Sequence, residues 1–302
     1  MKPIHLKSIT ELHRNFNLPG PGHPLISVIN YADLQLPSFK EEISAMFDFY
    51  YISLKKGFSN KLFYGQQTYD FDEGMMYFVA PHQILRGAGP EPGDDLSGWI
   101  LMIHPDLLWG TSLAKNISKY DFFDYAVNEA LFLSDKEKNI INGIISNIQN
   151  EYQSNLDQFS QDIIVSHIET LLNYSERFYQ RQFLTRKKSS SEVLTKVESL
   201  LNDFFDNEEL SSRGLPPVQY LANHMNLSAK YLGSLLKQLT GQTTQQHIHE
   251  KLIAKAKERL STTTLSVSEI AYGLGFEHVQ SFSKLFKTKT KQSPLEFRAG
   301  FS

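Results

Sequence analysis

Residues 277 to 291 carry the side chains whose chemistry is most readily interpreted in this sequence. Cationic and polar groups recur there: His278, Gln280, Ser281, Lys284 and Lys287. Ammonium groups neutralise phosphates, and amide, hydroxyl and imidazole groups form hydrogen bonds with the edges of bases. The segment has a single acidic residue, Glu277, so a polyanion would meet little repulsion. These residue types predict a nucleic-acid-binding surface, with Lys287 on a phosphate and the other four in a groove.

A helix, a tight turn and a second helix are needed to position these side chains. Apolar residues recur at helical spacing before and after the turn: Val267, Ile270, Ala271 and Leu274, then Phe282, Leu285 and Phe286. Gly275 can adopt the positive φ that a sharp turn requires. Phe276 is expected to fill the angle between the helices. This arrangement lets the second helix enter a major groove while the first crosses the DNA backbone.

A second copy of the same plan lies upstream. Its apolar positions are Val218, Leu221, Ala222 and Met225, then Leu232, Leu235, Leu236 and Leu239. Ser228 is placed to cap the second helix, and Thr240-Gly241 is placed to end it. Lys230, Ser234 and Lys237 are the predicted DNA-binding residues of this unit. Because small residues occupy 233 and 234, this helix is expected to read few bases and to contact phosphates through its lysines.

Residues 244–260 are predicted to form one helix between the two units. Seventeen residues at about 1.5 Å each make a rod of roughly 25 Å. Successive major grooves on one face of a duplex lie about 34 Å apart. A rod of this size could therefore hold two reading helices in neighbouring grooves.

A set of residues at fixed offsets extends through this region: Ile270, Ala271, Gly275, Phe276, Ser281, Phe282, Lys284, Phe286, Lys287, Ser293, Pro294, Phe297 and Arg298. With this pattern, residues 190–302 resemble the AraC/XylS family of bacterial transcription regulators. The upstream unit matches too, through Leu221-Ala222, Leu227-Ser228, Tyr231-Leu232, Leu236-Lys237 and Thr240-Gly241. One position departs from the family: Lys291 stands where a glycine is usual, which implies a less favourable helix end.

Charge and composition agree with an organisation in two parts. The chain has 302 residues, which favours two domains. Residues 1–185 carry a net charge of −8, and residues 186–302 carry +5, which suggests that the second part meets a polyanion. No apolar run has the ~18–20 residues needed to span a bilayer, and the N-terminus lacks the features of a signal peptide. With no cysteine, a cytoplasmic location is expected, and thiolate chemistry, including the DNA-alkylation repair of one relative of the family, is excluded.

The first part changes character along its length. Residues 24–105 hold short β-branched and aromatic runs separated by turn residues, which favours a sandwich or barrel. Residues 135–184 show isoleucines at helical spacing and predict a helical hairpin, whose apolar stripe packs either on its own barrel or on a second copy of the chain. Residues 185–191 are a candidate linker. The predicted fold class is α+β in two domains. The resemblance implies that residues 1–184 form a sensing and dimerisation domain with a cupin-like β-barrel. Residues 192–302 are predicted to form an all-α double helix-turn-helix domain.

The histidines do not form an obvious metal site, so no metal, cofactor or catalytic residue is expected. His82 and His104 are isolated in the sequence, and His247 and His249 cannot bind one ion from the same helix face. A cupin-type metal-dependent enzyme with a helical appendage remains an alternative, as does a module whose helices bind other proteins. The aromatic residues of the strands are either barrel core or the lining of an effector pocket.

The resemblance implies a sequence-specific regulator that binds double-stranded promoter DNA. Activation is the commoner output of the family, with RNA polymerase as a partner. The family also implies a homodimer and a possible small-molecule effector in the N-terminal barrel. No enzymatic activity and no membrane partner are expected.

Overall fold

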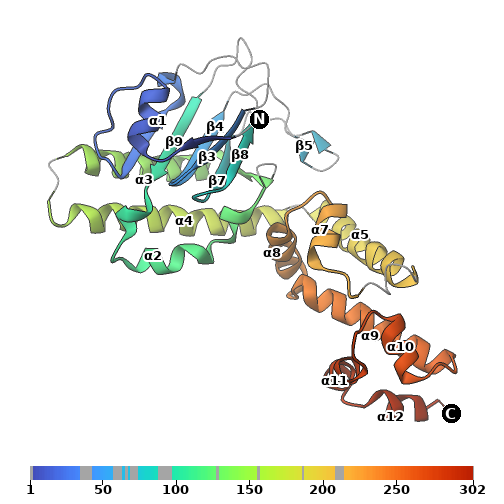
Figure 1. Ribbon diagram of the computed structural model, residues 1–302. Helices are drawn as coiled ribbons and strands as arrows, with labels where there is room; N and C mark the ends of the chain where they lie inside the picture. The colour runs from blue at the N-terminus through green and yellow to red at the C-terminus, as the bar shows by residue number, and fades with distance from the viewer. Residues whose placement is uncertain are drawn as a thin grey trace. The chain divides into compact units, whose positions relative to one another are not determined.

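The computed structural model describes residues 3–34, 43–56, 63–64, 67–68, 74–87, 97–126, 129–154, 157–185, 187–207 and 214–301. The chain divides into two compact units, Met1–Gln182 and Phe183–Ser302. The first unit combines β-sheets with helices, and the second is helical throughout its described residues (Figure 1). This confirms the predicted α+β organisation in two parts.

Three sheets form the first unit. The five-stranded sheet has the order β10-β7-β4-β9-β2, with β2 Ile26–Asn30, β4 Tyr50–Lys56, β7 Met75–Val79, β9 Ser97–Ile103 and β10 Leu131–Phe132. The three-stranded sheet has the order β1-β3-β8, with β1 Ile4–Leu6, β3 Ile43–Phe47 and β8 Ile84–Gly87. β5 Phe63–Tyr64 pairs with β6 Gln67–Thr68. The sequence favoured a sandwich or barrel, and the described strands form these separate sheets.

Both faces of the five-stranded sheet are covered, which explains its nearly continuous apolar strands. One face contributes Ile29, Tyr51, Tyr77 and Met102 to a core shared with β1, β3 and helix α1 (Ile9–Asn15). The other face carries side chains such as Trp99, whose indole N–H donates to Asn142 of α3 at 2.9 Å. The sheet is therefore a central layer of the unit.

Two long helices follow the strands. They are α3 Asp135–Gln153 and α4 Ser160–Thr185, as the isoleucine spacing predicted. They are antiparallel, because Arg181 near the end of α4 forms an ion pair of 2.7 Å with Glu137 in the first turn of α3. The shorter helix α2, Ser112–Asn116, precedes them. Within the described residues, no helix is both long and apolar enough to cross a membrane.

The second unit consists of short helices packed on two longer ones. The longer helices are α5 Lys187–Asp206 and α9 Thr244–Thr262. The shorter ones are α7 Val218–His224, α8 Ala229–Thr240, α10 Val267–Gly273, α11 Val279–Thr290 and α12 Pro294–Ala299. α9 extends the rod predicted for residues 244–260 by two residues.

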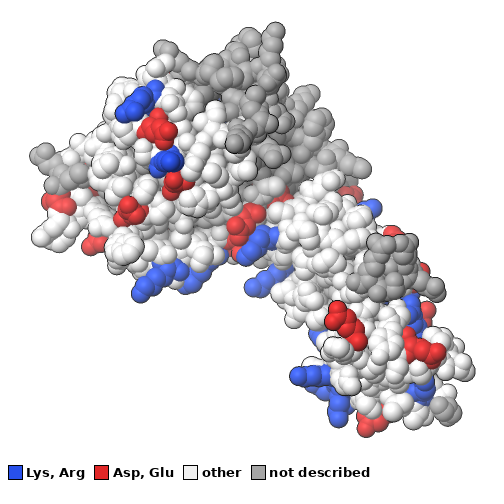
Figure 2. Space-filling view, in the orientation of Figure 1, with Lys and Arg blue, Asp and Glu red and all other residues white. Residues whose placement is uncertain are grey.

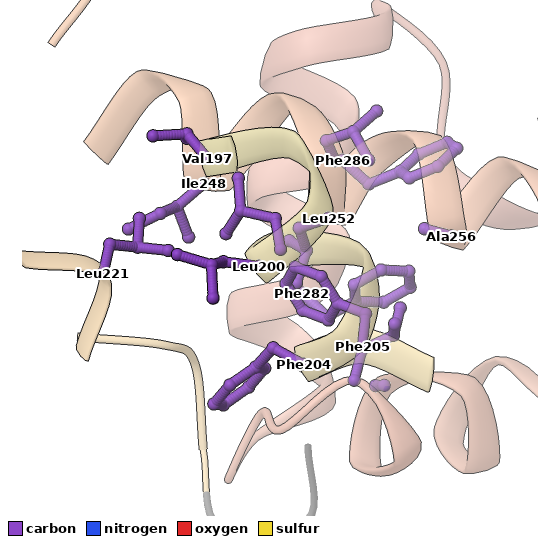
Figure 3. Packing of buried hydrophobic residues seen from close by; sticks show 14 of the residues in the cluster. Val197, Leu200, Phe204, Phe205, Leu221, Ile248, Leu252, Ala256, Phe282 and Phe286 are labelled. Carbon is purple, nitrogen blue, oxygen red and sulfur yellow. The ribbon is translucent and has the colours of Figure 1, made fainter. Parts of the chain in front are cut away.

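A single apolar core joins the helices of this unit. It includes Val197 and Phe205 of α5, Leu221 of α7, Leu252 of α9 and Phe282 of α11 (Figure 3). Phe282 is fully buried, and its ring centroid lies 5.8 Å from that of Phe286. The two helix-turn-helix units therefore share one core.

Helix α5 begins at Lys187, five residues before the start expected from the apolar pattern. The polar residues 187–191 continue the helix because lysine is a good helix former and serine costs only a fraction of a kcal/mol in a helix. Arg186 lies outside the described residues. The linker at 185–191 and the boundaries at 184 and 192 remain predictions.

Candidate nucleic-acid interface

The two helix-turn-helix units have the same turn geometry. The N–H of Leu227 donates to Ala222 O at 3.0 Å, and the N–H of Phe276 donates to Ala271 O, also at 3.0 Å. Each turn contains one residue of positive φ, Asn226 (φ 55°) in the first and Gly275 (φ 87°) in the second. Glycine and asparagine adopt this conformation with least strain. The predicted turn at Gly275 is thus present, and its counterpart uses asparagine.

Phe276 lies where the sequence placed it, in the angle between α10 and α11. Its side chain is partly buried and packs against the shared core, with its ring centroid 5.4 Å from that of Phe282. The ring therefore fixes the angle at which α11 leaves the turn.

Both second helices begin and end at equivalent places. Ser228 accepts a hydrogen bond from Tyr231 N at 3.1 Å and so caps α8, as predicted. His278 is the N-cap residue of α11, without a side-chain capping bond. α8 ends at Gly241 (φ 74°) and α11 at Lys291 (φ 65°), and in each case the N–H of this residue donates at 2.8 Å to the carbonyl four residues earlier. The non-glycine helix end expected at Lys291 is therefore present in the left-handed conformation.

Each residue of α8 corresponds to the residue of α11 whose number is 50 higher. Both have 12 residues and end in the left-handed conformation. Under this shift, Lys230, Ser234 and Lys237 of α8 correspond to Gln280, Lys284 and Lys287 of α11. At about 100° per residue, each set of three lies within an arc of roughly 60°. Each helix thus presents one narrow polar face, made of the residues that the sequence predicted.

The remaining predicted residues lie near this face of α11. Ser281 is exposed and lies about 60° around the helix from Lys284. His278 is also exposed, just outside the helix at its N-terminal end. Lys289, in contrast, lies on the opposite side of α11. There its charge adds to the effect of burial in lowering the pKa of His249 on α9.

The lysines of α11 are available to a ligand. Lys284, Lys287 and Lys291 are exposed and form no ion pair with any described residue. Figure 2 shows Lys and Arg side chains gathered at the surface over α11. One nearby acidic side chain, Glu296, is used in a helix cap, where it accepts a hydrogen bond from the backbone N–H of Ser293 at 2.7 Å. The backbone N–H of Ser293 holds the pKa of Glu296 below its usual value, and Lys287 adds a smaller effect.

Other cations of this unit have internal partners, which the sequence did not reveal. Arg259 donates to Gly273 O at 3.0 Å and to Phe205 O at 3.3 Å. Arg298 donates to Leu260 O and Leu265 O. Part of the positive charge counted in the sequence therefore bonds backbone carbonyls. No sequence signal distinguishes these arginines from phosphate-binding ones, because their partners lie 14 to 54 residues away.

In the N-terminal unit, His82 lies beside a carboxylate that a second histidine also contacts. His82 Nδ1 lies 3.1 Å from Asp48 Oδ1, which also bonds His5 Nε2 at 2.6 Å. The three residues are distant in sequence and meet where β1 and β3 end. Across the described part of the chain, no group of three or more His, Cys, Asp or Glu side chains is arranged to hold a metal ion.

Tyr31, Ser53 and Tyr77 form a buried polar cluster on the face of the five-stranded sheet that lines the core shared with β1, β3 and α1. The hydroxyl of Tyr31 lies 2.6 Å from Ser53 Oγ and 3.3 Å from the hydroxyl of Tyr77. Lys55 Nζ lies 5.0 Å from the centroid of the Tyr77 ring. Burial raises the pKa of Tyr77, but Lys55 and neighbouring hydroxyls outweigh it, so that its pKa is lowered. An ammonium and several hydroxyl groups thus meet inside an otherwise apolar layer.

Comparison with known proteins places the helix-turn-helix units in a family. Residues 221–300 match a family model described as a helix-turn-helix domain. This range covers most of the first helix-turn-helix (α7 and α8) and all of the second (α10 and α11).

Two curated relatives are regulators of transcription. The chain is 32% identical over 146 residues to the uncharacterized HTH-type transcriptional regulator YfiF of Bacillus subtilis, covering 48% of this chain and 42% of YfiF. It is 33% identical over 123 residues to the HTH-type transcriptional activator RhaS of Escherichia coli, covering 41% of this chain and 44% of RhaS. The match thus spans less than half of the length of either relative.

Among solved structures, the C-terminal domain of the two-component response regulator yesN from Fusobacterium nucleatum is similar. It is 30% identical, and the match covers 33% of this chain and 96% of that domain with a TM-score of 0.29.

Proposed function

We propose that this chain is a transcription regulator of the AraC type that binds promoter DNA specifically, which the helix-turn-helix match of residues 221–300 and the two regulators of similar sequence support. The observation that carries the proposal is the pair of equivalent polar faces on α8 and α11. Each belongs to the second helix of a helix-turn-helix unit, which is the helix that enters the major groove in this kind of motif.

The two faces have different chemistry, and this suggests different roles. On α8, lysines flank Ser234, so the helix binds mainly phosphates through Lys230 and Lys237. On α11, Gln280 and Lys284 can form hydrogen bonds with adenine and guanine edges, respectively. Ser281 and His278 add contacts at the start of that helix, and Lys287 binds a phosphate. Most sequence readout therefore comes from α11.

Selection of binding sites from a random DNA library by the full chain tests this proposal. The enriched sequences are expected to share two conserved segments about one helical turn apart, the one read by α11 being better defined. Lys284→Ala is expected to weaken binding to the enriched site and to relax the base preference at one position. No enrichment with the unmodified chain would overturn the proposal.

In this proposal the N-terminal unit is a cupin-like domain that senses a small molecule. Support comes from its two facing sheets and from the buried hydroxyls of Tyr31, Ser53 and Tyr77, with the partly buried Lys55 beside them. Ligand pockets are mostly apolar and carry a few convergent polar groups that fix the orientation of the ligand, and this cluster has that composition. Lys55→Met is expected to abolish the response to an effector while leaving DNA binding intact. Screening metabolites by thermal shift would find the effector.

The remaining partners follow from the family. The chain forms a homodimer through α3 and α4, where Ile140 and Ile163 are each 40% exposed. It activates transcription, as the name of one relative suggests, and RNA polymerase is the partner that the family resemblance implies. Binding to promoter DNA requires that it works in the cytoplasm. Light scattering of the purified chain tests the dimer, and Ile140→Glu is expected to yield monomers.

A further inference from the structure

Arg259 occupies an unusual position between three helices of the C-terminal unit. It belongs to α9 and is partly buried. Its guanidinium donates to Phe205 O in the last turn of α5 and to Gly273 O at the end of α10. Carbonyls in the last turn of a helix have no partner within that helix, and they carry partial negative charge. One cation therefore satisfies the ends of two helices at once.

This contact joins the two helix-turn-helix units through the side chain of Arg259, in addition to the connection along the backbone of α9. α5 packs against α7 of the first helix-turn-helix, where the ring centroids of Phe204 and Tyr220 lie 5.0 Å apart. The end of α5 is then bonded through Arg259 to α10 of the second helix-turn-helix. The two units are thus connected twice: along the rod of α9, and across α5 through Arg259.

We infer that Arg259 is a positioning residue that fixes the angle between α8 and α11 and thereby sets the half-site spacing that the protein accepts. The inference rests on the proposed DNA binding. A rod alone fixes the distance between the reading helices, but the second unit could still rotate about the rod's apolar contacts. Hydrogen bonds are directional, whereas apolar contacts are not, so the bonds of Arg259 restrict this rotation.

Spacing matters because DNA is helical. One inserted base pair turns the second half-site by about 34–36° relative to the first, since a turn contains about 10–10.5 base pairs. A rigid protein cannot follow this rotation without losing contacts. For the unmodified chain, affinity is expected to fall at least about tenfold on insertion of one base pair, similar to a mismatched base pair.

Two variants break the hydrogen bonds of Arg259 to α5 and α10 by different means. Arg259→Ala removes the guanidinium. Gly273→Ala keeps it but displaces it, because a Cβ at Gly273 would lie 2.9 Å from Nη1 of Arg259. Alanine also favours helix more than glycine does, so Gly273→Ala is not expected to unfold α10. For both variants, the spacing penalty, which is the loss of affinity on insertion of one base pair, is expected to be less than about threefold.

Lys255→Ala is the matched control. Lys255 lies one turn earlier on α9 and bonds Asp206 of α5 at 2.7 Å and Glu258 of its own helix at 3.5 Å. Neither partner belongs to the second helix-turn-helix (α10 and α11). Removing this cation costs the same charge and also weakens the link between α5 and α9. It is expected to leave the spacing penalty unchanged.

The experiment measures the affinity of the full-length variants for the selected site and for sites with one base pair inserted or deleted, at several salt concentrations. Far-UV circular dichroism at the assay temperature verifies that each variant is folded. For Arg259→Ala and Gly273→Ala, the inference predicts a smaller spacing penalty and an unchanged dependence of affinity on salt. If Arg259 bound a phosphate instead, Arg259→Ala would weaken all sites equally and lower the salt slope by about 0.9.

That outcome would overturn the inference, as would an unchanged spacing penalty in Gly273→Ala. If Arg259→Ala does not fold, Gly273→Ala alone decides the question. Failure of the unmodified chain to bind any selected DNA would instead contradict the proposed function, so the two failures can be distinguished.

Discussion

Replacing Lys291 by glycine is expected to stabilise the C-terminal unit. Lys291 ends α11 with φ 65° and ψ 5°, and the equivalent Gly241 ends α8 with φ 74° and ψ 0°. The same hydrogen bond of 2.8 Å closes both helix ends. The backbone is thus nearly identical at the two positions, but only one of them has a residue suited to it.

The size of the effect follows from two opposing contributions. The left-handed conformation costs a residue with a Cβ about 1–2 kcal/mol. Glycine loses more conformational freedom on folding, which costs about 0.5–1 kcal/mol. Lys291 is exposed and has no ion pair with a described residue, so its side chain contributes little else. The net gain is about 0.5–1 kcal/mol, equivalent to a rise in Tm of about 2–4 °C for a unit of this size.

Unfolding in urea can follow the two units separately. Both tryptophans, Trp99 and Trp109, lie in the N-terminal unit, so their fluorescence reports that unit alone. Circular dichroism at 222 nm also reports the helices of the C-terminal unit. Lys291→Gly is expected to raise the midpoint of the circular-dichroism transition that fluorescence does not detect.

Lys289→Gly is the control, since it removes the same side chain from the same helix. Residue 289 lies within α11, where glycine costs about 1 kcal/mol relative to good helix formers. The two substitutions are therefore expected to shift stability in opposite directions. If both shift it downward by similar amounts, the left-handed strain at Lys291 is refuted.

Phe282→Ala is expected to destabilise the C-terminal unit by about 3–5 kcal/mol in the same assay, because the ring is fully buried; a loss below about 1 kcal/mol would mean that the core is not packed around it. Lys287→Ala is expected to lower the slope of log affinity against log salt by about 0.9, and an unchanged slope would exclude a phosphate contact. A hydrogen bond from His5, with help from His82, holds the pKa of Asp48 below its ordinary value. Asp48 therefore stabilises the N-terminal unit above about pH 4, and its contribution is lost as the pH falls further. Unfolding midpoints of the unmodified chain and Asp48→Asn are expected to converge below that pH, and a constant difference would contradict this reasoning.

Local features of the helix-turn-helix units could be predicted from the sequence. Ser228 as a cap, Gly275 as a turn residue and Lys291 as a strained helix end all follow from rules that involve a few neighbouring residues. The spacing of the isoleucines likewise predicted α3 and α4. Periodicity was less reliable at helix ends, since Ile163, one of the isoleucines of the predicted hairpin, is 40% exposed.

Features that depend on tertiary contacts could not be predicted. Arg259 and Arg298 look like any other basic residues until their carbonyl partners are known. His82 meets Asp48 only because β1, β3 and the turn before β8 come together. Which of the predicted interface residues share a helix face follows from helical spacing alone, so that part could be worked out from the sequence. Their contacts with DNA remain predictions.

Methylation interference on the selected DNA site tests the central claim most directly. Methyl groups at guanine N7 block contacts in the major groove, so they mark where a reading helix lies. Two clusters of interfering guanines on one face of the duplex, about 10–10.5 base pairs apart, are predicted, with interference at one guanine opposite α11 lost in Lys284→Ala. A single cluster, or two clusters on opposite faces of the duplex, would contradict the assignment of α8 and α11 as paired reading helices.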